Sequence, residues 1–178
     1  MDDDQVLATA MDRLDRRYAF ERKRRREPEL DDTLKEFVAR LRGAYGSLAA
    51  VRGKRILDLA SGSNSSRSPK TRRRTALFEP WFSRLLVELG AEPVAIDLGD
   101  LEGEAFEHHR VDLGRTGDLD FLPDATFDGV QDSRLFGSPE FLAAYPGPEH
   151  RARVKAEIKR QERRLLRPGG VVIHSDEP

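Results

Sequence analysis

The chain has 178 residues, a formal net charge of −1 and no cysteine. This length fits one domain with a sizeable core. Without cysteine there can be no disulfides, thiolate nucleophiles or cysteine-ligated zinc, and the four histidines show no metal-ligand spacing. We therefore expect no metal site. The near-neutral net charge argues against a protein that is basic overall and coats nucleic acid.

Neither a membrane span nor a signal peptide is visible in the sequence. No apolar run approaches the ~20 residues that cross a bilayer, and the acidic start Met1–Gln5 is unlike the basic head of a signal peptide. We therefore expect a cytoplasmic protein with no membrane partner. Its charge is nevertheless clustered, because Glu21–Glu27 reads ERKRRRE and Arg67–Arg74 reads RSPKTRRR.

The first fifty residues have the periodicity of helices. One apolar stripe predicts a helix that ends before Pro28, and a second stripe predicts another helix behind it. The two stripes are Leu7, Met11, Leu14 and Tyr18, and then Leu34, Phe37, Val38 and Leu41. Thr33 and Glu36 have the spacing of a capping box at the start of the second helix.

From residue 53 onward, short apolar runs alternate with helical segments. The runs predict strands at 55–59, 93–97, 109–113, 127–131 and 171–174. Between them we expect a helix with Pro80 in its first turn and Gly90 at its end, a charged helix that begins at Pro148, and a mobile loop of low apolar content over 66–74. This alternation predicts an α/β fold with a mostly parallel sheet of about five strands and helices on both faces. Residues 1–52 form an N-terminal helical segment on the acceptor side, and 53–178 form the ligand-binding domain.

In such sheets the ligand lies beyond the carboxyl ends of the strands. Asp58–Asn64 closes the first strand with small residues, which let the backbone pass close to a ligand, and Gly62 can adopt a left-handed conformation. Asp97 ends the second strand, where a carboxylate can accept hydrogen bonds from both ribose hydroxyls. Asp112 ends the third strand, where it could meet an adenine amino group. Each has a structural alternative. The segment Asp58–Asn64 could be a plain turn, Asp97 could cap a helix or turn, and Asp112 could be a solvated carboxylate.

Four segments resemble motifs of class I S-adenosylmethionine-dependent methyltransferases, in the order of that family. Gly53–Ser63 (GKRILDLASGS) is similar to the first motif and Val94–Asp97 (VAID) to the second. Leu122–Val130 (LPDATFDGV) resembles the entry to the fourth strand, and Leu165–Val172 (LLRPGGVV) resembles the turn before the fifth. The separation of Gly62 and Asp97 also exceeds the ~20 residues of the nicotinamide dinucleotide fingerprint.

The resemblance implies a Rossmann-like fold with S-adenosylmethionine as cofactor. Asp58, Ala60 and Gly62 would surround the methionine portion, Asp97 would hold the ribose, and Asp112 would border the adenine. Asp132 and Ser133 would face the methyl group and the acceptor, and Asp132 is the candidate general base, ahead of His150 and His174. The complete set of expected cofactor contacts is Asp58, Ala60, Ser61, Gly62, Asp97, Leu98, Asp112, Leu113 and Ser133.

The chain also departs from the family pattern. Ala60 and Asn64 stand where the family has the outer two glycines of its loop, and the family has two more strands after the fifth, whereas this sequence stops at Pro178. The fifth strand would then lie at a sheet edge. Three alternatives follow: a homodimer partner covers that edge, the N-terminal helices cover it, or the chain is a shortened product.

These patterns favour methyl transfer to an oxygen or nitrogen atom of a small-molecule acceptor. Three alternatives stay open: a degenerate methyltransferase-like domain that serves as a binding or scaffold module, an RNA-directed methyltransferase that uses the basic loop 67–74, and a nicotinamide-dependent oxidoreductase. A small molecule is favoured over nucleic acid as the acceptor.

Overall fold

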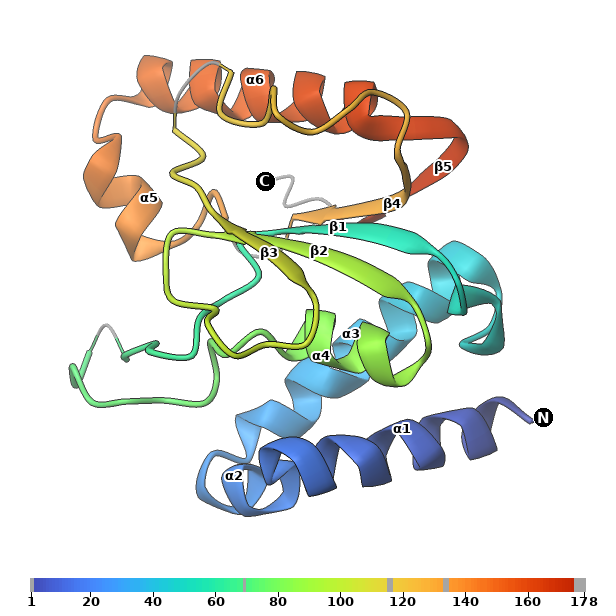
Figure 1. Ribbon diagram of the computed structural model, residues 1–178. Coiled ribbons are helices and arrows are strands. Elements are labelled where there is room, and N and C mark those ends of the chain that lie inside the picture. The colour runs from blue at the N-terminus through green and yellow to red at the C-terminus, as the bar shows by residue number, and fades with distance from the viewer. Residues whose placement is uncertain (1, 69, 115–116, 133–134, 175–178) are drawn as a thin grey trace.

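The computed structural model describes residues 2–68, 70–114, 117–132 and 135–174 (Figure 1). Its centre is one five-stranded sheet with the order β3-β2-β1-β4-β5, in which every neighbouring pair is parallel. The strands are β1 Arg55–Leu59, β2 Glu92–Asp97, β3 Glu107–Arg110, β4 Phe127–Asp132 and β5 Leu166–His174. The direction of strand progression reverses at β1, which has β2 on one side and β4 on the other. Ligands of open α/β sheets bind at such a reversal.

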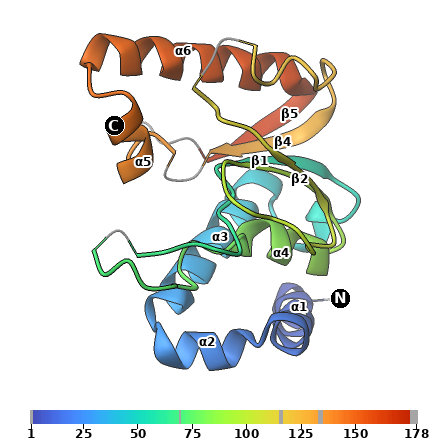
Figure 2. The same ribbon diagram turned by 60° about the vertical axis from the view of Figure 1, so that its left-hand side comes forward.

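Helices cover both faces of this sheet, as Figures 1 and 2 show: α6 lies over one face, and α3 and α4 lie over the other with α1 and α2 outside them. The predicted Rossmann-like α/β architecture is therefore confirmed. The helices are α1 Asp3–Tyr18, α2 Phe20–Arg26, α3 Glu29–Tyr45, α4 Trp81–Glu88, α5 Pro139–Ala144 and α6 Pro148–Leu165, with a short 3-10 turn at Ala49–Val51.

Alternate residues of β1 belong to two different cores. Ile56 packs into the core formed with α1, α2, α3 and α4, whereas Leu57 and Leu59 pack into the core under α6. This division follows from the two-residue period of a strand, which sends successive side chains to opposite faces. The N-terminal helices thus share a core with the sheet, while the division of the chain at residue 52 stays a prediction.

Several sequence-based expectations at the N-terminus need correction. The first helix does not continue to Pro28, because Ala19 adopts a left-handed conformation (φ 52°) and separates α1 from α2. The capping box was also wrong. Thr33 lies inside α3, where its hydroxyl donates to the carbonyl of Glu29 at 3.1 Å.

The third strand is displaced from its predicted position. It comprises residues 107–110 rather than 109–113 and pairs with β2 from Val94 to Asp97. Asp112 consequently lies two residues beyond the strand instead of ending it. The sequence EHHR gives no apolar run, so the pairing is set by the backbone of the neighbouring strand. Helix α5 was not predicted.

Residues 66–68 and 70–75 contain backbone pairing that the sequence did not indicate, while the predicted mobility of this loop stays a prediction. Arg67 and Arg74 form an antiparallel bridge, the amide of Ser68 donates to the carbonyl of Arg73 at 2.9 Å, and the amide of Thr75 donates to the carbonyl of Ser66 at 3.2 Å. We call this segment the basic hairpin. It projects from the body of the molecule beside the carboxyl ends of the strands (Figures 1 and 2).

Within the described ranges, no helix combines the length and the apolar character that crossing a membrane would require. The outer strands of the described sheet are β3 and β5, and Val172 of β5 is 49% exposed. A homodimer through the β5 edge stays a prediction.

Candidate functional site

The turn after β1 and the carboxylate of Asp97 meet at one point. The amide of Gly62 donates to Asp97 Oδ2 at 2.9 Å, and the amide of Gly99 donates to Asp97 Oδ1 at 2.7 Å. The two segments come together because β1 and β2 are adjacent and parallel, so that both end at the same edge of the sheet. A carboxylate offers about four acceptor positions, and these two backbone bonds fix its orientation at the edge.

The turn keeps the backbone shape of a glycine-rich loop despite its alanine. Gly62 has φ 93°, and a Cβ there would lie 2.3 Å from the carbonyl oxygen of Phe78, so residue 62 cannot carry a side chain. Ala60 also has a positive φ, of 56°. A left-handed conformation costs a non-glycine residue about 1–2 kcal/mol. The expected left-handed Gly62 is confirmed, and strain is concentrated at Ala60.

The side chain of Asn64 has a structural function in the turn after β1. Its Oδ1 accepts from Arg84 Nη2 at 2.7 Å, and its Nδ2 donates to the carbonyl of Glu102 at 3.3 Å. The amide of Asn64 also donates to the carbonyl of Asp100 at 2.8 Å. Asn64 therefore ties the turn after β1 to the segment after β2, which a glycine side chain could not do.

Arg84 of α4 connects this turn to the rest of the molecule, and sequence reasoning missed it. The residue is 3% exposed and pairs with the carboxylates of Glu79 and Glu104, the latter at 2.7 Å. Its guanidinium carbon also lies 4.2 Å from the ring centroid of Tyr18 and 4.6 Å from that of Trp81. The available signal was a lone arginine inside the apolar helix sequence WFSRLLVE.

Asp58 lies under the sheet rather than at its open edge. It is 1% exposed, and the hydroxyl of Ser83 in α4 donates to its Oδ2 at 2.7 Å. Asp58 Oδ1 and both amide atoms of Gln131, its neighbour in β4, are buried without a hydrogen-bond partner among the described residues. Burial raises the pKa of Asp58 to about 7, which the Ser83 hydroxyl opposes and the nearby Asp97 charge reinforces.

This raised pKa predicts that the protein loses stability as the pH rises. The folded state retains the Asp58 proton up to about pH 7, whereas the unfolded chain releases it near 3.8, so stability falls between those values and then levels off. The fall should amount to at most about 4 kcal/mol. Urea denaturation at pH 5 and pH 8 should show a smaller difference for Asp58→Asn than for the unchanged protein. The exposed Asp112→Asn serves as control, and an equal pH response in all three proteins would contradict the prediction.

The remaining expected cofactor contacts have different exposures. Leu98, directly after Asp97, is 55% exposed, and its carbonyl accepts from Arg110 Nε at 2.8 Å. Ser61 is half-buried, Asp112 is exposed and Leu113 is buried. Leu98 therefore offers apolar surface beside the carboxylate. Ser133 lies outside the described residues.

Asp132, the candidate general base, is fully buried at the end of β4. It pairs with Lys159 of α6, whose Nζ also lies 3.2 Å from Glu162 Oε2. Burial, reinforced by the Asp132 carboxylate, raises the pKa of Glu162 to about 7. The role of Asp132 as a base stays a prediction. Of the other candidates, His150 is exposed with its ring 4.9 Å from that of Tyr145, and His174 ends β5.

Comparisons with known proteins identify a structural neighbour but no family. No protein-family model matches the chain, and no match was found among curated proteins. Among solved structures, the chain is similar to an arsenic (III) S-adenosylmethionine methyltransferase from Chlamydomonas reinhardtii, with 18% sequence identity and a TM-score of 0.38. The match covers 68% of this chain and 38% of the other, so it spans well under half of that solved protein. Function has to be inferred from this chain's own residues.

Metal-ligating side chains do not gather in the part of the chain that the structure describes: no group of three or more histidine, aspartate or glutamate residues is placed to hold an ion there. The polar group that the structure places at the open edge of the sheet is the Asp97 carboxylate, which two backbone amides hold. Such an arrangement can bind hydroxyl groups.

Proposed function

We propose that the protein is an S-adenosylmethionine-dependent methyltransferase that transfers a methyl group to an oxygen or nitrogen atom of a small-molecule acceptor. The observation that carries this proposal is the contact between the turn after β1 and the carboxylate of Asp97, through the 2.9 Å hydrogen bond from Gly62. The contact lies beside the strand-order reversal, where α/β sheets bind nucleotides.

The residues at this edge fit an adenosyl ligand. Asp97 is oriented by two backbone amides and can accept hydrogen bonds from ribose hydroxyls. Leu98 follows it with more than half of its surface exposed, which suits the apolar face of a purine. The backbone at Ala60–Gly62 is half-buried, so part of it is open to a ligand, while the absence of a side chain at residue 62 lets the Phe78 carbonyl pack against the turn. These features give the edge of the sheet one polar anchor and one apolar platform.

When bound, S-adenosylmethionine supplies a methyl group already activated on a sulfonium. The protein's residues then have to bind the cofactor and orient it toward the acceptor. Asp97 holds the ribose, Leu98 packs against the adenine, and the turn after β1 lies against the methionine portion. Orientation alone can lower a barrier by several kcal/mol. A base is needed only for an acceptor that retains its proton. Asp132 is our candidate to take that proton. Its carboxylate is paired with Lys159, so this ion pair has to open before Asp132 can act as a base.

Calorimetric titration with S-adenosylhomocysteine, with NAD as the competing ligand class, tests this proposal. We expect micromolar binding of S-adenosylhomocysteine and no heat with NAD. Binding of NAD alone would instead identify an oxidoreductase. A second assay follows the transfer of labelled methyl groups from S-adenosylmethionine to small-molecule extract fractions.

A scaffold module without catalysis is the second candidate, and one contact favours it. A Cβ on Gly99 would lie 2.3 Å from Ser63 Cβ, so the segments after β1 and β2 pack tightly against each other. This packing reduces the space beside Asp97 in which a ligand could bind. A folded protein that binds neither ligand in the titration would support the scaffold function and end the methyltransferase proposal.

A further inference from the structure

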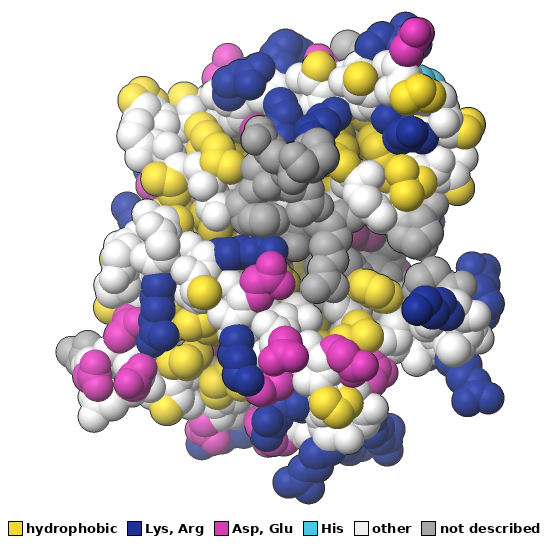
Figure 3. All heavy atoms as spheres, turned by 180° about the vertical axis from the view of Figure 1, so that it is seen from behind, with side chains coloured by type: hydrophobic (Ala, Val, Ile, Leu, Met, Phe, Trp, Pro, Cys, Tyr) yellow, Lys and Arg dark blue, Asp and Glu magenta, His cyan; other side chains and the backbone are white. Residues whose placement is uncertain are grey.

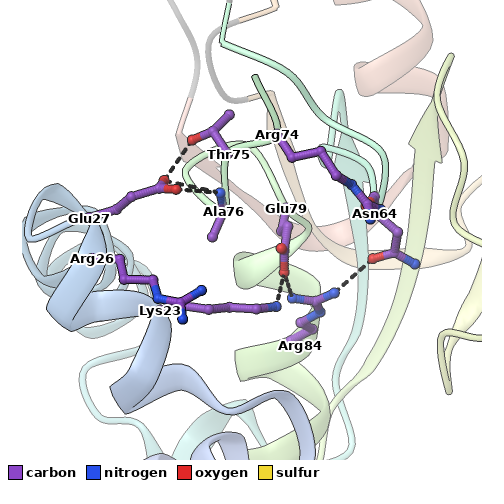
Figure 4. Close-up of a pocket in the computed structure, with 9 residues that line it drawn as sticks. All are labelled: Lys23, Arg26, Glu27, Asn64, Arg74, Thr75, Ala76, Glu79 and Arg84. Carbon is purple, nitrogen blue, oxygen red and sulfur yellow. Dashed lines mark hydrogen bonds and ion pairs between the residues drawn. The ribbon is translucent and has the colours of Figure 1, made fainter. Parts of the chain in front are cut away.

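The two basic clusters of the sequence lie on one side of the molecule. A cavity of about 480 Å³ separates α2 from the base of the basic hairpin. Lys23 and Arg26 line it from α2, Arg74 lines it from the hairpin, and Arg84 lies at its floor (Figure 4). Segments about fifty residues apart in sequence thus bring cations to one cavity, which Glu27 and Glu79 also line.

The acidic residues of this cavity are already engaged. Glu79 accepts from Lys23 Nζ at 2.6 Å and also pairs with Arg84. Glu27 accepts from the hydroxyl of Thr75 at 2.6 Å and from the amide of Ala76 at 3.0 Å (Figure 4). The charge of Glu79 is thus offset by Lys23 and Arg84, whereas Glu27 is held by neutral donors and keeps its negative charge in the cavity.

Four of the outer cations have no such partner. Within the described part of the chain, no hydrogen bond or ion pair engages the side chains of Arg26, Lys70, Arg72 and Arg73, and all four are exposed. Together with Arg67 and Arg74 they form what we call the basic face. Leaving this many like charges adjacent and unpaired disfavours the folded state, which an anionic partner would relieve.

The shape of the basic face favours an extended polyanion over a small anion. Figure 3 shows Lys and Arg side chains pointing in several directions from the projecting part of the molecule, instead of converging on one point. The hairpin sequence SRSPKTRRRT contains no acidic residue and no large apolar residue that could insert into a lipid surface. Phe78, which follows the hairpin, is 37% exposed.

We propose that the basic face binds the phosphate backbone of single-stranded nucleic acid, with Phe78 as a platform on which a base stacks. Proteins that bind single-stranded nucleic acid combine cations along the path of the phosphate backbone with exposed aromatic rings on which bases stack. The cavity between α2 and the hairpin is large enough to receive a phosphate group. This binding does not depend on methyl transfer and would also be present in a catalytically inactive scaffold.

Fluorescence anisotropy with a labelled 20-nucleotide RNA of mixed sequence, at 50–300 mM salt, tests the proposal. With five phosphate contacts, the affinity should fall about a hundredfold between 50 and 200 mM salt. The triple variant Lys70→Gln, Arg72→Gln, Arg73→Gln loses no hydrogen bond, so it should fold normally. It should reduce the logarithmic salt slope by about 2. Phe78→Ala should weaken binding about tenfold with the salt slope unchanged.

The matched control is the triple variant Arg13→Gln, Arg153→Gln, Arg163→Gln, whose arginines are exposed and lie outside the basic face. It changes the net charge by the same −3. It should leave both affinity and slope nearly unchanged. Absence of RNA binding at 50 mM salt would overturn the proposal, as would equal losses in the two triple variants. Binding to anionic phosphatidylserine vesicles without binding to RNA would assign the basic face to membranes and overturn it too.

Discussion

Replacing Asp97 with alanine is expected to weaken the binding of S-adenosylhomocysteine about a hundredfold. Two charge-assisted hydrogen bonds to ribose hydroxyls would be lost, and each contributes about 1.5 kcal/mol or more. Their sum, about 3 kcal/mol, corresponds to about a hundredfold in the dissociation constant. Isothermal titration calorimetry measures the change directly. Asp12→Ala on α1, where the carboxylate is exposed, is the control.

The same substitution also removes the acceptor for the amides of Gly62 and Gly99. Weakened binding could then arise from a disordered turn, so a second variant is required. Leu98→Glu alters a side chain that is 55% exposed, which leaves the fold intact but places a charge where the purine should lie. It should also abolish binding. If both variants bind S-adenosylhomocysteine as the unchanged protein does, the assignment of this edge to an adenosyl ligand is wrong.

Arg84→Leu is expected to lower the free energy of unfolding by about 3–5 kcal/mol, because it removes one partner of buried ion pairs. Among the residues that the structure describes, the carboxylate of Glu104, whose side chain is 3% exposed, would keep only the hydroxyl of Tyr18 as a hydrogen-bond donor, at 3.1 Å. Asn64 would also lose its contact with α4. Urea denaturation followed by circular dichroism measures the loss.

Two comparisons make this second prediction specific. The surface pair Arg16–Asp12 has side chains that are 75% and 56% exposed, so Arg16→Leu should cost at most about 1 kcal/mol. The double variant Arg84→Leu, Glu104→Leu should recover part of the lost stability, because it no longer leaves a buried charge unpaired. A cost for Arg84→Leu no larger than that for Arg16→Leu would show that the buried network does not stabilise the fold.

The alternation of short apolar runs and helical stripes was sufficient to predict the layers of the fold. β1 and β2 were correctly placed because buried parallel strands read as near-continuous apolar runs, and β4 was placed although its sequence FDGVQD contains three polar residues. The third strand was misplaced because Glu107–Arg110 is polar and is held by the backbone of β2. The break at Ala19 was missed because an alanine carries no local signal for a left-handed conformation.

For the candidate site, sequence spacing was sufficient to place the turn after β1 beside Asp97, because parallel neighbours end at the same edge. The network around Arg84 could not be predicted in this way. Its acidic partners, Glu79 and Glu104, come from loops on opposite sides of α4 in the sequence, and their approach depends on tertiary packing. The proximity of the two basic clusters likewise follows from the position of α2 in the folded molecule.

The central position of β1 has a consequence for how the protein forms during synthesis. Both of its neighbours come later in the chain, with β2 beginning at Glu92 and β4 at Phe127. The nascent polypeptide therefore carries the strand RILDL with an open edge until β4, which begins at Phe127, has left the ribosome. Non-local parallel pairing is slow, and unpaired apolar strands associate with other chains. Protection of this segment by a chaperone would be most valuable in that interval.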